Sequence, residues 1–320
     1  MEKIYIGVDV GSVSINVIAI NENNELLFKS YVRNVGQPID IVKGEFAKLN
    51  NELPNMEIGG VGVTGSGRQL LGYVVGADIV KNEITAHATA TLYFFPDVST
   101  IFEIGGQDSK LIIINDGTIA DFAMNTVCAA GTGSFLDHQA ERLGIKIEDF
   151  GEIALTAKRD VRIAGRCTVF AESDMISKQQ YGFSKAEILK GLSKALVRNY
   201  MNNLVRGRKL KPVFVFQGGV AANISIKKAF EEEVDHEVLV PEHYGIMGAI
   251  GIAMLARDQI KKTGEKTKFK GFKVSEDEFE TTTFICKGCP NECEIIQIKA
   301  NGKVIAMTGD KCGRYSNSII

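Results

Sequence analysis

The chain has 320 residues, of which 45% are hydrophobic and 24% charged, so it can bury a large core in about two globular lobes. A formal net charge of −2 leaves no basic excess to neutralise a nucleic-acid backbone or an anionic membrane surface, so we expect neither partner. The sequence starts in a predicted strand without a signal peptide, and its longest apolar run, 244–256, is too short to cross a bilayer, so a cytoplasmic protein is expected.

Strand-like and helix-like segments alternate along the chain, which predicts an α/β fold. A strand over 4–11 is followed by a hairpin over 15–33, a helix over 40–53 and a strand over 58–67. The segment 99–125 repeats the opening as strand, glycine turn, strand, Asp-Gly turn and strand. The repetition predicts a pseudo-duplicated fold with a nucleotide held between its halves.

The first glycine turn, in GVDVGSVSIN, suits phosphate chemistry. Asp9 ends a strand where its carboxylate can organise a hydrated divalent cation. Gly11, Ser12 and Ser14 offer backbone N–H groups and hydroxyl donors. The same residues also suit a plain hairpin turn, so this motif does not decide the function alone.

Two later turns have the same character. In FEIGGQDSK, a Gly-Gly pair allows close backbone approach, and Gln107 and Asp108 can orient water or metal. In VFVFQGGVAAN, at 213–223, a third strand ends in Gly-Gly, and its small residues let a flat ring lie against the backbone. Three such turns in this order are a stronger signal than any one of them.

The motifs GVDVGSVSIN, TGSGR, EIGGQDSK, NTVCAAGTGSFLD, GRCTVFAESD and FQGGVAAN follow one another along the chain. In this order they resemble the activators of 2-hydroxyacyl-CoA dehydratases and the related benzoyl-CoA reductase ATPase subunits, within the actin, Hsp70 and sugar-kinase superfamily. The resemblance covers about residues 3–258. It implies a two-lobed, actin-like and ribonuclease H-like ATPase fold, which we divide into lobe I at 1–96 and lobe II at 97–257, with the terminal helix packing back on lobe I.

The resemblance also implies an activity. The implied protein is a homodimer that binds ATP or ADP with Mg²⁺ and holds one [4Fe-4S] cluster between its subunits. ATP hydrolysis then drives transfer of one low-potential electron to a partner iron-sulfur enzyme, and a ferredoxin or flavodoxin supplies the electron.

Carried over position by position, the resemblance makes Cys128 and Cys167 the cluster ligands. The positions with an implied catalytic role are Asp9, Glu103, Gln107 and Asp108. The positions implied to bind nucleotide are Gly11, Ser12, Ser14, Gly105, Gly106, Gly131, Thr132, Gly133, Gly218, Gly219 and Ala221. Two positions depart from the pattern: Asn16 stands where many relatives carry lysine, and Glu103 where aspartate is common.

Both cysteines immediately precede a helical pattern. A helix N-terminus carries partial positive charge, which suits thiolates bound to an anionic cluster. A nucleotide bound by Gly131 and Gly133 would lie at the start of the helix that Cys128 precedes. We therefore expect ATP binding to close the two lobes and to rotate the helices that follow the two cysteines. The alternative is that both are buried structural cysteines.

A second cysteine group follows a charged segment, 258–283, that we expect to be a linker or surface excursion. Within 284–320, the Asn301-Gly302 pair predicts a hairpin that brings the end near Cys293 close to Cys312. The C-x2-C-x3-C…C set, made of Cys286, Cys289, Cys293 and Cys312, predicts a module that binds zinc or a second iron-sulfur cluster. An unmetallated, poorly ordered tail is the alternative.

Two other functions stay open on the residues alone. A small-molecule kinase of the same superfamily would use Asp108 as the base in a substrate pocket. A nucleotide-dependent scaffold or sensor would use the cysteine module as a zinc-stabilised docking surface. Of the histidines, His87 lies on a predicted helix and is expected to be structural.

Overall fold

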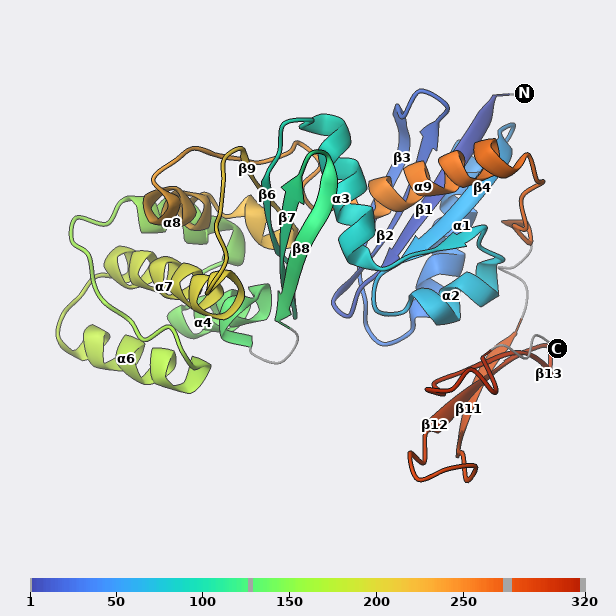
Figure 1. Ribbon diagram of the computed structural model, residues 1–320. Helices are drawn as coiled ribbons and strands as arrows, with labels where there is room; N and C mark the ends of the chain where they lie inside the picture. Colours follow the sequence, from blue (N-terminus) through green and yellow to red (C-terminus); the bar gives the residue numbers. More distant parts are fainter. Residues whose placement is uncertain (1, 126–128, 273–277, 317–320) are drawn as a thin grey trace. The chain divides into compact units, whose positions relative to one another are not determined.

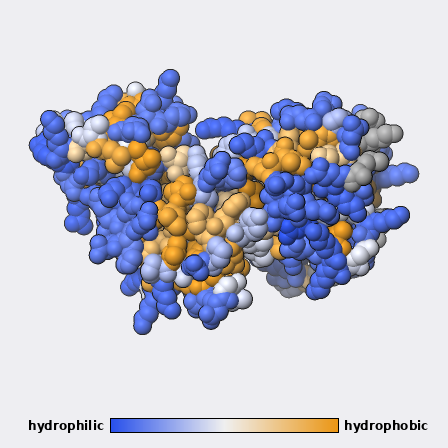
Figure 2. All heavy atoms as spheres, turned by 90° about the horizontal axis from the view of Figure 1, so that it is seen from above, coloured by the Kyte–Doolittle hydropathy of each residue, from blue (hydrophilic) through white to orange (hydrophobic). Residues whose placement is uncertain are grey.

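The computed structural model describes residues 2–125, 129–272 and 278–316, and the chain divides into two units (Figure 1). One consists of Met1–Ala86 with Gly248–Ile320, and the other of His87–Met247. Among the described residues, none of the helices combines the length and the hydropathy that a bilayer crossing requires. On the face that Figure 2 shows, hydrophobic side chains form patches within a mostly hydrophilic surface.

The first unit is built on a five-stranded sheet of order β3-β2-β1-β4-β5. The strands β1 (Lys3–Val10), β2 (Ser14–Asn21) and β3 (Leu26–Arg33) are antiparallel, whereas β4 (Glu57–Thr64) and β5 (Ile79–Val80) run parallel to β1. Strands β1 and β2 are apolar and buried over nearly their whole length, as central strands covered on both faces must be. The predicted strand, hairpin and later strand of this region are confirmed.

Helices cover both faces of this sheet. On one face, α1 (Pro38–Glu52) and α2 (Arg68–Val75) share a hydrophobic core with β1, β2 and β4. On the other face lies α9 (Met247–Thr263), so close that a β-carbon at Gly7 would be 2.0 Å from a main-chain oxygen of the helix. Glycine in β1 therefore lets the last helix of the unit lie directly on the strand backbone.

The second unit repeats the strand order of the first. Its sheet runs β10-β9-β6-β7-β8. The strands β6 (Thr100–Ile104), β7 (Ser109–Asn115) and β8 (Thr118–Asn125) are antiparallel, and β9 (Phe214–Gln217) and β10 (Val238–Leu239) run parallel to β6. Because β6 to β10 correspond in order and direction to β1 to β5, the duplication predicted from two glycine turns is confirmed.

The helices of the second unit surround a core centred on α7. They are α3 (Glu83–Phe94), which crosses the boundary between the units, α4 (Gly133–Leu143), α5 (Phe150–Leu155), α6 (Thr168–Gln180), α7 (Lys185–Tyr200) and α8 (Ile224–Val234), with short helical turns η1 (Ala129–Gly131), η2 (Ile147–Asp149), η3 (Met201–Val205) and η4 (Gly219–Ala222). A capping box of Ser184 and Glu187 starts α7. Phe102 of β6 stacks on Phe230 of α8, with ring centroids 4.6 Å apart, and meets Tyr200 of α7 edge-on at 5.7 Å. The sheet and two helices are thereby joined in one aromatic cluster.

The C-terminal region forms a three-stranded antiparallel sheet of order β11-β12-β13. Its strands are β11 (Phe279–Ile285), β12 (Glu294–Ala300) and β13 (Lys303–Thr308). Asn301 and Gly302 both have positive φ, 49° and 77°, so the predicted hairpin turn is confirmed. The sheet adds β11 to that hairpin. Between α9 and β11, Phe269 packs edge-on against Phe46 of α1, with ring centroids 5.7 Å apart.

Candidate functional site

The first glycine turn joins β1 to β2 and contains three of the predicted nucleotide-site residues. Asp9 lies at the end of β1, directly opposite the buried Asn16 on β2. The Gly11 N–H donates to the Ser14 carbonyl at 2.9 Å, which closes the turn. Asn16, one of the two positions that depart from the family pattern, therefore pairs across the strands with Asp9, whose carboxylate we expect to organise a cation.

The loop after β4 packs against this turn. The Ser66 hydroxyl donates to the Val10 carbonyl at 3.2 Å and lies 3.5 Å from the Ser12 hydroxyl. A β-carbon at Gly65, whose φ is +89°, would lie 2.6 Å from Asp9 Oδ1. We did not predict Gly65 and Ser66 as site residues, although TGSG after a strand was a visible signal. Only the adjacency of β1 and β4 brings that loop to Asp9.

The turn between β6 and β7 carries a buried charge cluster. Lys110 Nζ donates to Glu103 Oε2 and to Asp108 Oδ1, both at 2.9 Å. Glu103 and Lys110 are register partners, as Asp9 and Asn16 are in the first turn. Burial alone lowers the pKa of an ammonium group, but the two carboxylates raise the pKa of Lys110 above its usual value. Lys110 therefore stays charged and holds both carboxylates in place.

Sequence reasoning missed Lys110, although its position opposite Glu103 follows from the tight hairpin. The Gly105 N–H donates to the Asp108 carbonyl at 3.0 Å, which closes that hairpin, and Gln107 is exposed at its tip. A kinase base must be available to the substrate hydroxyl. Asp108 Oδ1 accepts a hydrogen bond from Lys110, but the side chain is still 35% exposed, so this contact does not decide between the kinase alternative and the activator.

The start of α4 is docked on the same hairpin. The Gly133 N–H donates to the Gly105 carbonyl at 2.9 Å, and the Ser134 N–H donates to the Gly106 carbonyl at 2.8 Å. Thr132 is fully buried, and its hydroxyl donates to the carbonyl of the first η1 residue at 2.8 Å. The structure thus brings the Gly-Gly pair at 105–106 and the GTG motif at 131–133 together. Hydrogen bonds from the first two backbone amides of α4 join them.

The third predicted turn lies against the second. Gly218, which directly follows β9, has a φ of +88°, and a β-carbon there would lie 2.4 Å from the Ile104 carbonyl oxygen and 2.6 Å from Glu103 Oε1. Its N–H donates to the Tyr244 carbonyl at 2.9 Å. Only glycine allows this backbone conformation together with this close approach to β6.

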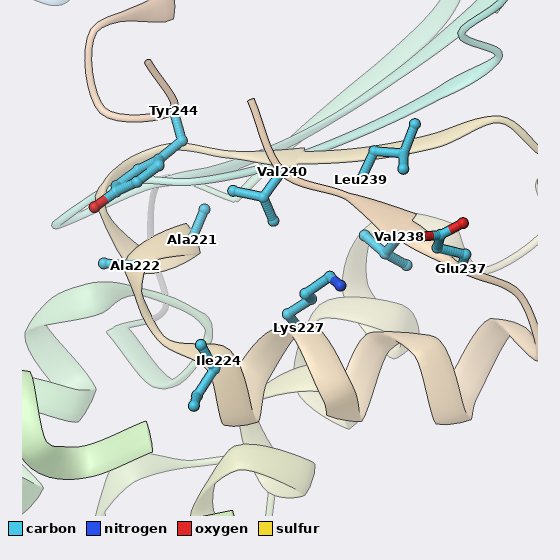
Figure 3. Close-up of a pocket in the computed structure, with 9 residues that line it drawn as sticks. All are labelled: Ala221, Ala222, Ile224, Lys227, Glu237, Val238, Leu239, Val240 and Tyr244. Carbon is cyan, nitrogen blue, oxygen red and sulfur yellow. The ribbon is translucent and has the colours of Figure 1, made fainter. Parts of the chain in front are cut away.

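A cavity of about 390 Å³ opens beside this turn, between η4, α8 and β10 (Figure 3). Most of its lining is apolar, and Lys227 and Glu237 add one charge of each sign. The apolar lining consists of Ala221, Ala222, Ile224, Val238, Leu239, Val240 and Tyr244. The volume and lining suit a flat ring with a few polar groups, as in small-molecule sites generally.

Cys167 is the N-cap residue of α6, so the prediction that it immediately precedes a helix is confirmed. It is half-buried, with an extended backbone at φ −145°. The next residues of the helix are apolar and open to solvent, with Val169 64% and Phe170 65% exposed. Cys128, the other expected ligand, lies outside the described residues.

One side chain of α7 joins the loops that carry these motifs. Asn199 is buried, and its Nδ2 donates to the Gly165 carbonyl, two residues before Cys167, at 2.5 Å. Its Oδ1 accepts from Asn203 Nδ2 at 2.9 Å and also lies close to Gly131 in the GTG loop (131–133), where a β-carbon would be 2.8 Å away. Sequence reasoning missed Asn199, and no local pattern marks it.

Within the described ranges, which leave out Cys128, no three His, Cys, Asp or Glu side chains gather closely enough to hold a metal ion. Of the C-terminal cysteines, Cys286 is buried, Cys293 is half-buried, and Cys289 and Cys312 are exposed.

Comparison with known proteins adds independent information. Residues 6–256 match the BadF/BadG/BcrA/BcrD ATPase family. The chain is 33% identical over 259 residues to the (R)-2-hydroxyglutaryl-CoA dehydratase activating ATPase of Acidaminococcus fermentans, which covers 80% of this chain and 98% of that protein. It is 32% identical over 263 residues to the activator of lactoyl-CoA dehydratase of Anaerotignum propionicum, with 80% and 98% covered.

A solved structure has the same fold over the same region. The activator of the 2-hydroxyisocaproyl-CoA dehydratase from Clostridium difficile, with bound ADPNP, superposes with a TM-score of 0.74 at 29% identity, covering 82% of this chain and 97% of that one. The matched region of the family ends at residue 256, so the C-terminal sheet lies beyond it.

Proposed function

Because this chain belongs to the BadF/BadG/BcrA/BcrD ATPase family, we propose that it is an ATP-hydrolysing activator that passes a low-potential electron to a partner iron-sulfur enzyme. The relatives are named as activators of dehydratases that act on 2-hydroxyacyl-CoA substrates, so an enzyme of that class is the proposed acceptor. A ferredoxin or a flavodoxin is the proposed donor.

ATP and ADP are the proposed ligands of the glycine turns and of the cavity beside η4. The apolar cavity wall at Ala221 suits adenine, and a relative of the same fold holds ADPNP. Carboxylate and hydroxyl oxygens are ligands that Mg²⁺ accepts, and Asp9 and Ser12 offer them in one turn. When bound, Mg²⁺ supplies positive charge that offsets the charge of the phosphates. Gln107, exposed at the tip of its hairpin, is proposed to orient the attacking water.

A [4Fe-4S] cluster is proposed to bind between two copies of the chain, with Cys128 and Cys167 contributed by each copy. Four thiolates are the usual ligand set of such a cluster, which stores one electron at low potential. The position of Cys167 fits this role, because it lies half-buried at a helix N-terminus, whose partial positive charge suits an anionic cluster. The exposed Val169 and Phe170 beside it suit contact with a second copy.

The observation that carries the proposal is the position of Asn199. Its buried amide contacts the loop that leads to Cys167 and the GTG loop that we assign to nucleotide. A displacement of the GTG loop on nucleotide binding would therefore reach the Cys167 loop through one rigid helix. This arrangement gives ATP a physical route to the surroundings of the cysteine.

The test is anaerobic purification of the wild type and of the Cys128→Ser/Cys167→Ser variant. For the wild type we expect a coloured dimer that hydrolyses ATP and reduces a dehydratase partner in an ATP-dependent manner. The double variant should lose both the electron transfer and the iron that bridges the dimer. Ser316→Ala, beyond the region shared with the family, is the control and should keep both. Electron transfer that survives in the double variant would contradict the proposal.

A further inference from the structure

The C-terminal sheet brings its cysteines to one end. Cys286 directly follows the last residue of β11, and Cys293 directly precedes the first residue of β12. The two strands are antiparallel, and the Cys286 N–H donates to the Cys293 carbonyl at 2.8 Å, so these cysteines face each other across the strand pair. Cys289 lies in the turn between them.

The fourth cysteine reaches the same end from β13. Thr308, the last residue of β13, pairs with Ile296 near the start of β12. The loop that follows is closed by Asp310, whose carboxylate accepts from the Tyr315 N–H at 2.9 Å. The Tyr315 ring packs edge-on against Phe284, with ring centroids 5.5 Å apart, two residues before Cys286. Cys312, inside this loop, is therefore carried back to the end of β11.

In the turn after β11, a backbone N–H group donates a hydrogen bond to a cysteine sulfur. The Gly288 N–H donates to Cys286 Sγ at 3.4 Å. A β-carbon at Gly288 would lie 2.8 Å from Arg314 and 3.4 Å from Cys286 Sγ, so the turn is closed tightly around that sulfur. Hydrogen bonds from backbone N–H groups to sulfur tune thiolate-bound metal centres.

The sheet has little apolar core of its own. In its described residues the buried hydrophobic side chains are Ile295, Ile298, Ala306 and Cys286, while Phe284, Ile285 and Ile296 are exposed. A domain of this size usually needs a metal or another cross-link to be stable.

We propose that Cys286, Cys289, Cys293 and Cys312 form a four-thiolate metal centre, for Zn²⁺ or an iron-sulfur cluster, separate from the dimer-bridging cluster. The strand ends and the two turns place the four cysteines at one end of the sheet. In the described residues no three of their sulfurs are close enough to hold a metal, so binding requires the cysteine side chains to rotate toward one another. Zinc and a cluster share this ligand chemistry, and the metal analysis below separates them. The centre lies beyond the region shared with the family, so it does not depend on the proposed function.

The test uses the full chain with the bridging ligands already replaced, Cys128→Ser/Cys167→Ser, produced anaerobically with zinc and iron supplied. We expect this background to retain either about one zinc or about four irons per chain. Adding Cys286→Ser and Cys312→Ser should lower that content by about tenfold or more. Retention of the metal after these substitutions, or no bound metal in the background protein, would overturn the proposal.

A spectroscopic readout guards against variants that simply fold poorly. The metal-free background protein is titrated with Co²⁺ alone, because thiolate ligation produces charge-transfer absorption that other ligands do not. We expect those bands at full intensity in the background protein and in Ser316→Ala, a matched change in the same loop, and at clearly lower intensity in Cys293→Ser, which keeps three of the four thiolates. Equal bands in Cys293→Ser would count against the ligand set.

Discussion

Asn199 contacts two loops at once, so its replacement should affect more than stability. Asn199→Ala leaves the partly buried Gly165 carbonyl without its donor, which should lower the free energy of unfolding by about 1–3 kcal/mol. It should also reduce the electron transfer achieved per ATP hydrolysed, because the GTG loop and the Cys167 loop lose their shared contact. Urea unfolding and a coupled electron-transfer assay measure the two effects.

The matched control for Asn199 is Asn202→Ala, an exposed residue just past the end of α7. It should change neither quantity. If Asn199→Ala lowers stability while the ratio of electrons transferred to ATP hydrolysed stays at the wild-type value, the side chain has a structural role only.

His87 is a second buried polar residue whose contacts can be tested. Gln217 Nε2 lies 3.0 Å from His87 Nδ1, and Gln217 Oε1 accepts from the Thr91 hydroxyl at 2.9 Å. The Gln217 amide and the His87 imidazole therefore share a buried hydrogen bond. Burial, and then the charge of Lys110, lowers the pKa of His87 to about 3. These contacts agree with the structural role expected from the sequence.

The low pKa of His87 predicts a pH-dependent stability. In the unfolded chain the imidazole titrates near its ordinary pKa of about 6.5. Between pH 6.5 and 3 the unfolded chain thus binds one more proton than the folded one, so stability falls as the pH decreases through this window. Well inside the window the fall is about 1.4 kcal/mol per pH unit.

His87→Asn keeps an acceptor for Gln217 and cannot be protonated in this range, so it should remove that part of the pH dependence. Urea unfolding at several pH values gives the slopes. His138→Gln, at an exposed position of α4, is the control and should keep the wild-type slope. A slope in His87→Asn equal to that of the wild type would show that other groups cause the acid sensitivity.

At the scale of elements, the approach of α9 to its neighbours depends on glycine. A β-carbon at Gly251 would lie 1.8 Å from the Ala86 carbonyl oxygen at the start of α3. Gly251→Ala must therefore displace one of the two helices, and we expect a loss of about 1–3 kcal/mol. Gly44→Ala is the matched control, because nothing lies within 4 Å of that position on α1. It should raise stability by up to about 1 kcal/mol. Thermal unfolding that moves in the same direction for both variants would contradict this account.

The elements also show what the sequence can and cannot predict. The duplicated hairpins and the Asn301-Gly302 turn were predictable, because glycine turns and alternating apolar residues act within a few neighbouring positions. Lys110 was predictable in principle from its register with Glu103. The contact of Asn199 with Gly165 was not, because it depends on how α7 packs against loops distant in sequence.

At the scale of the whole molecule, the proposed activity requires nucleotide binding to change the free energy of an electron. A tenfold change in a one-electron equilibrium corresponds to about 59 mV or about 1.4 kcal/mol. A reductant made stronger by about 0.2 V therefore needs about 5 kcal/mol of differential binding, which a ligand that strongly prefers one conformation can supply. The burial of Asn199 matters at this scale, because a loose contact could not transmit energy of that size.

This requirement gives a prediction for the intact protein. Replacing ADP by a non-hydrolysable ATP analogue should lower the midpoint potential of the bridging cluster by roughly 0.1–0.2 V, the range set by the energetics above. It should also change the rate at which a chelator removes the cluster iron, because the surroundings of Cys167 shift with the GTG loop. Anaerobic redox titration and chelation kinetics measure the two effects, with Ser316→Ala as a control that leaves both unchanged. If the potential and the chelation rate are the same with either nucleotide, the nucleotide and the cysteine loops are not coupled, and the ATPase must act on its partner in some other way.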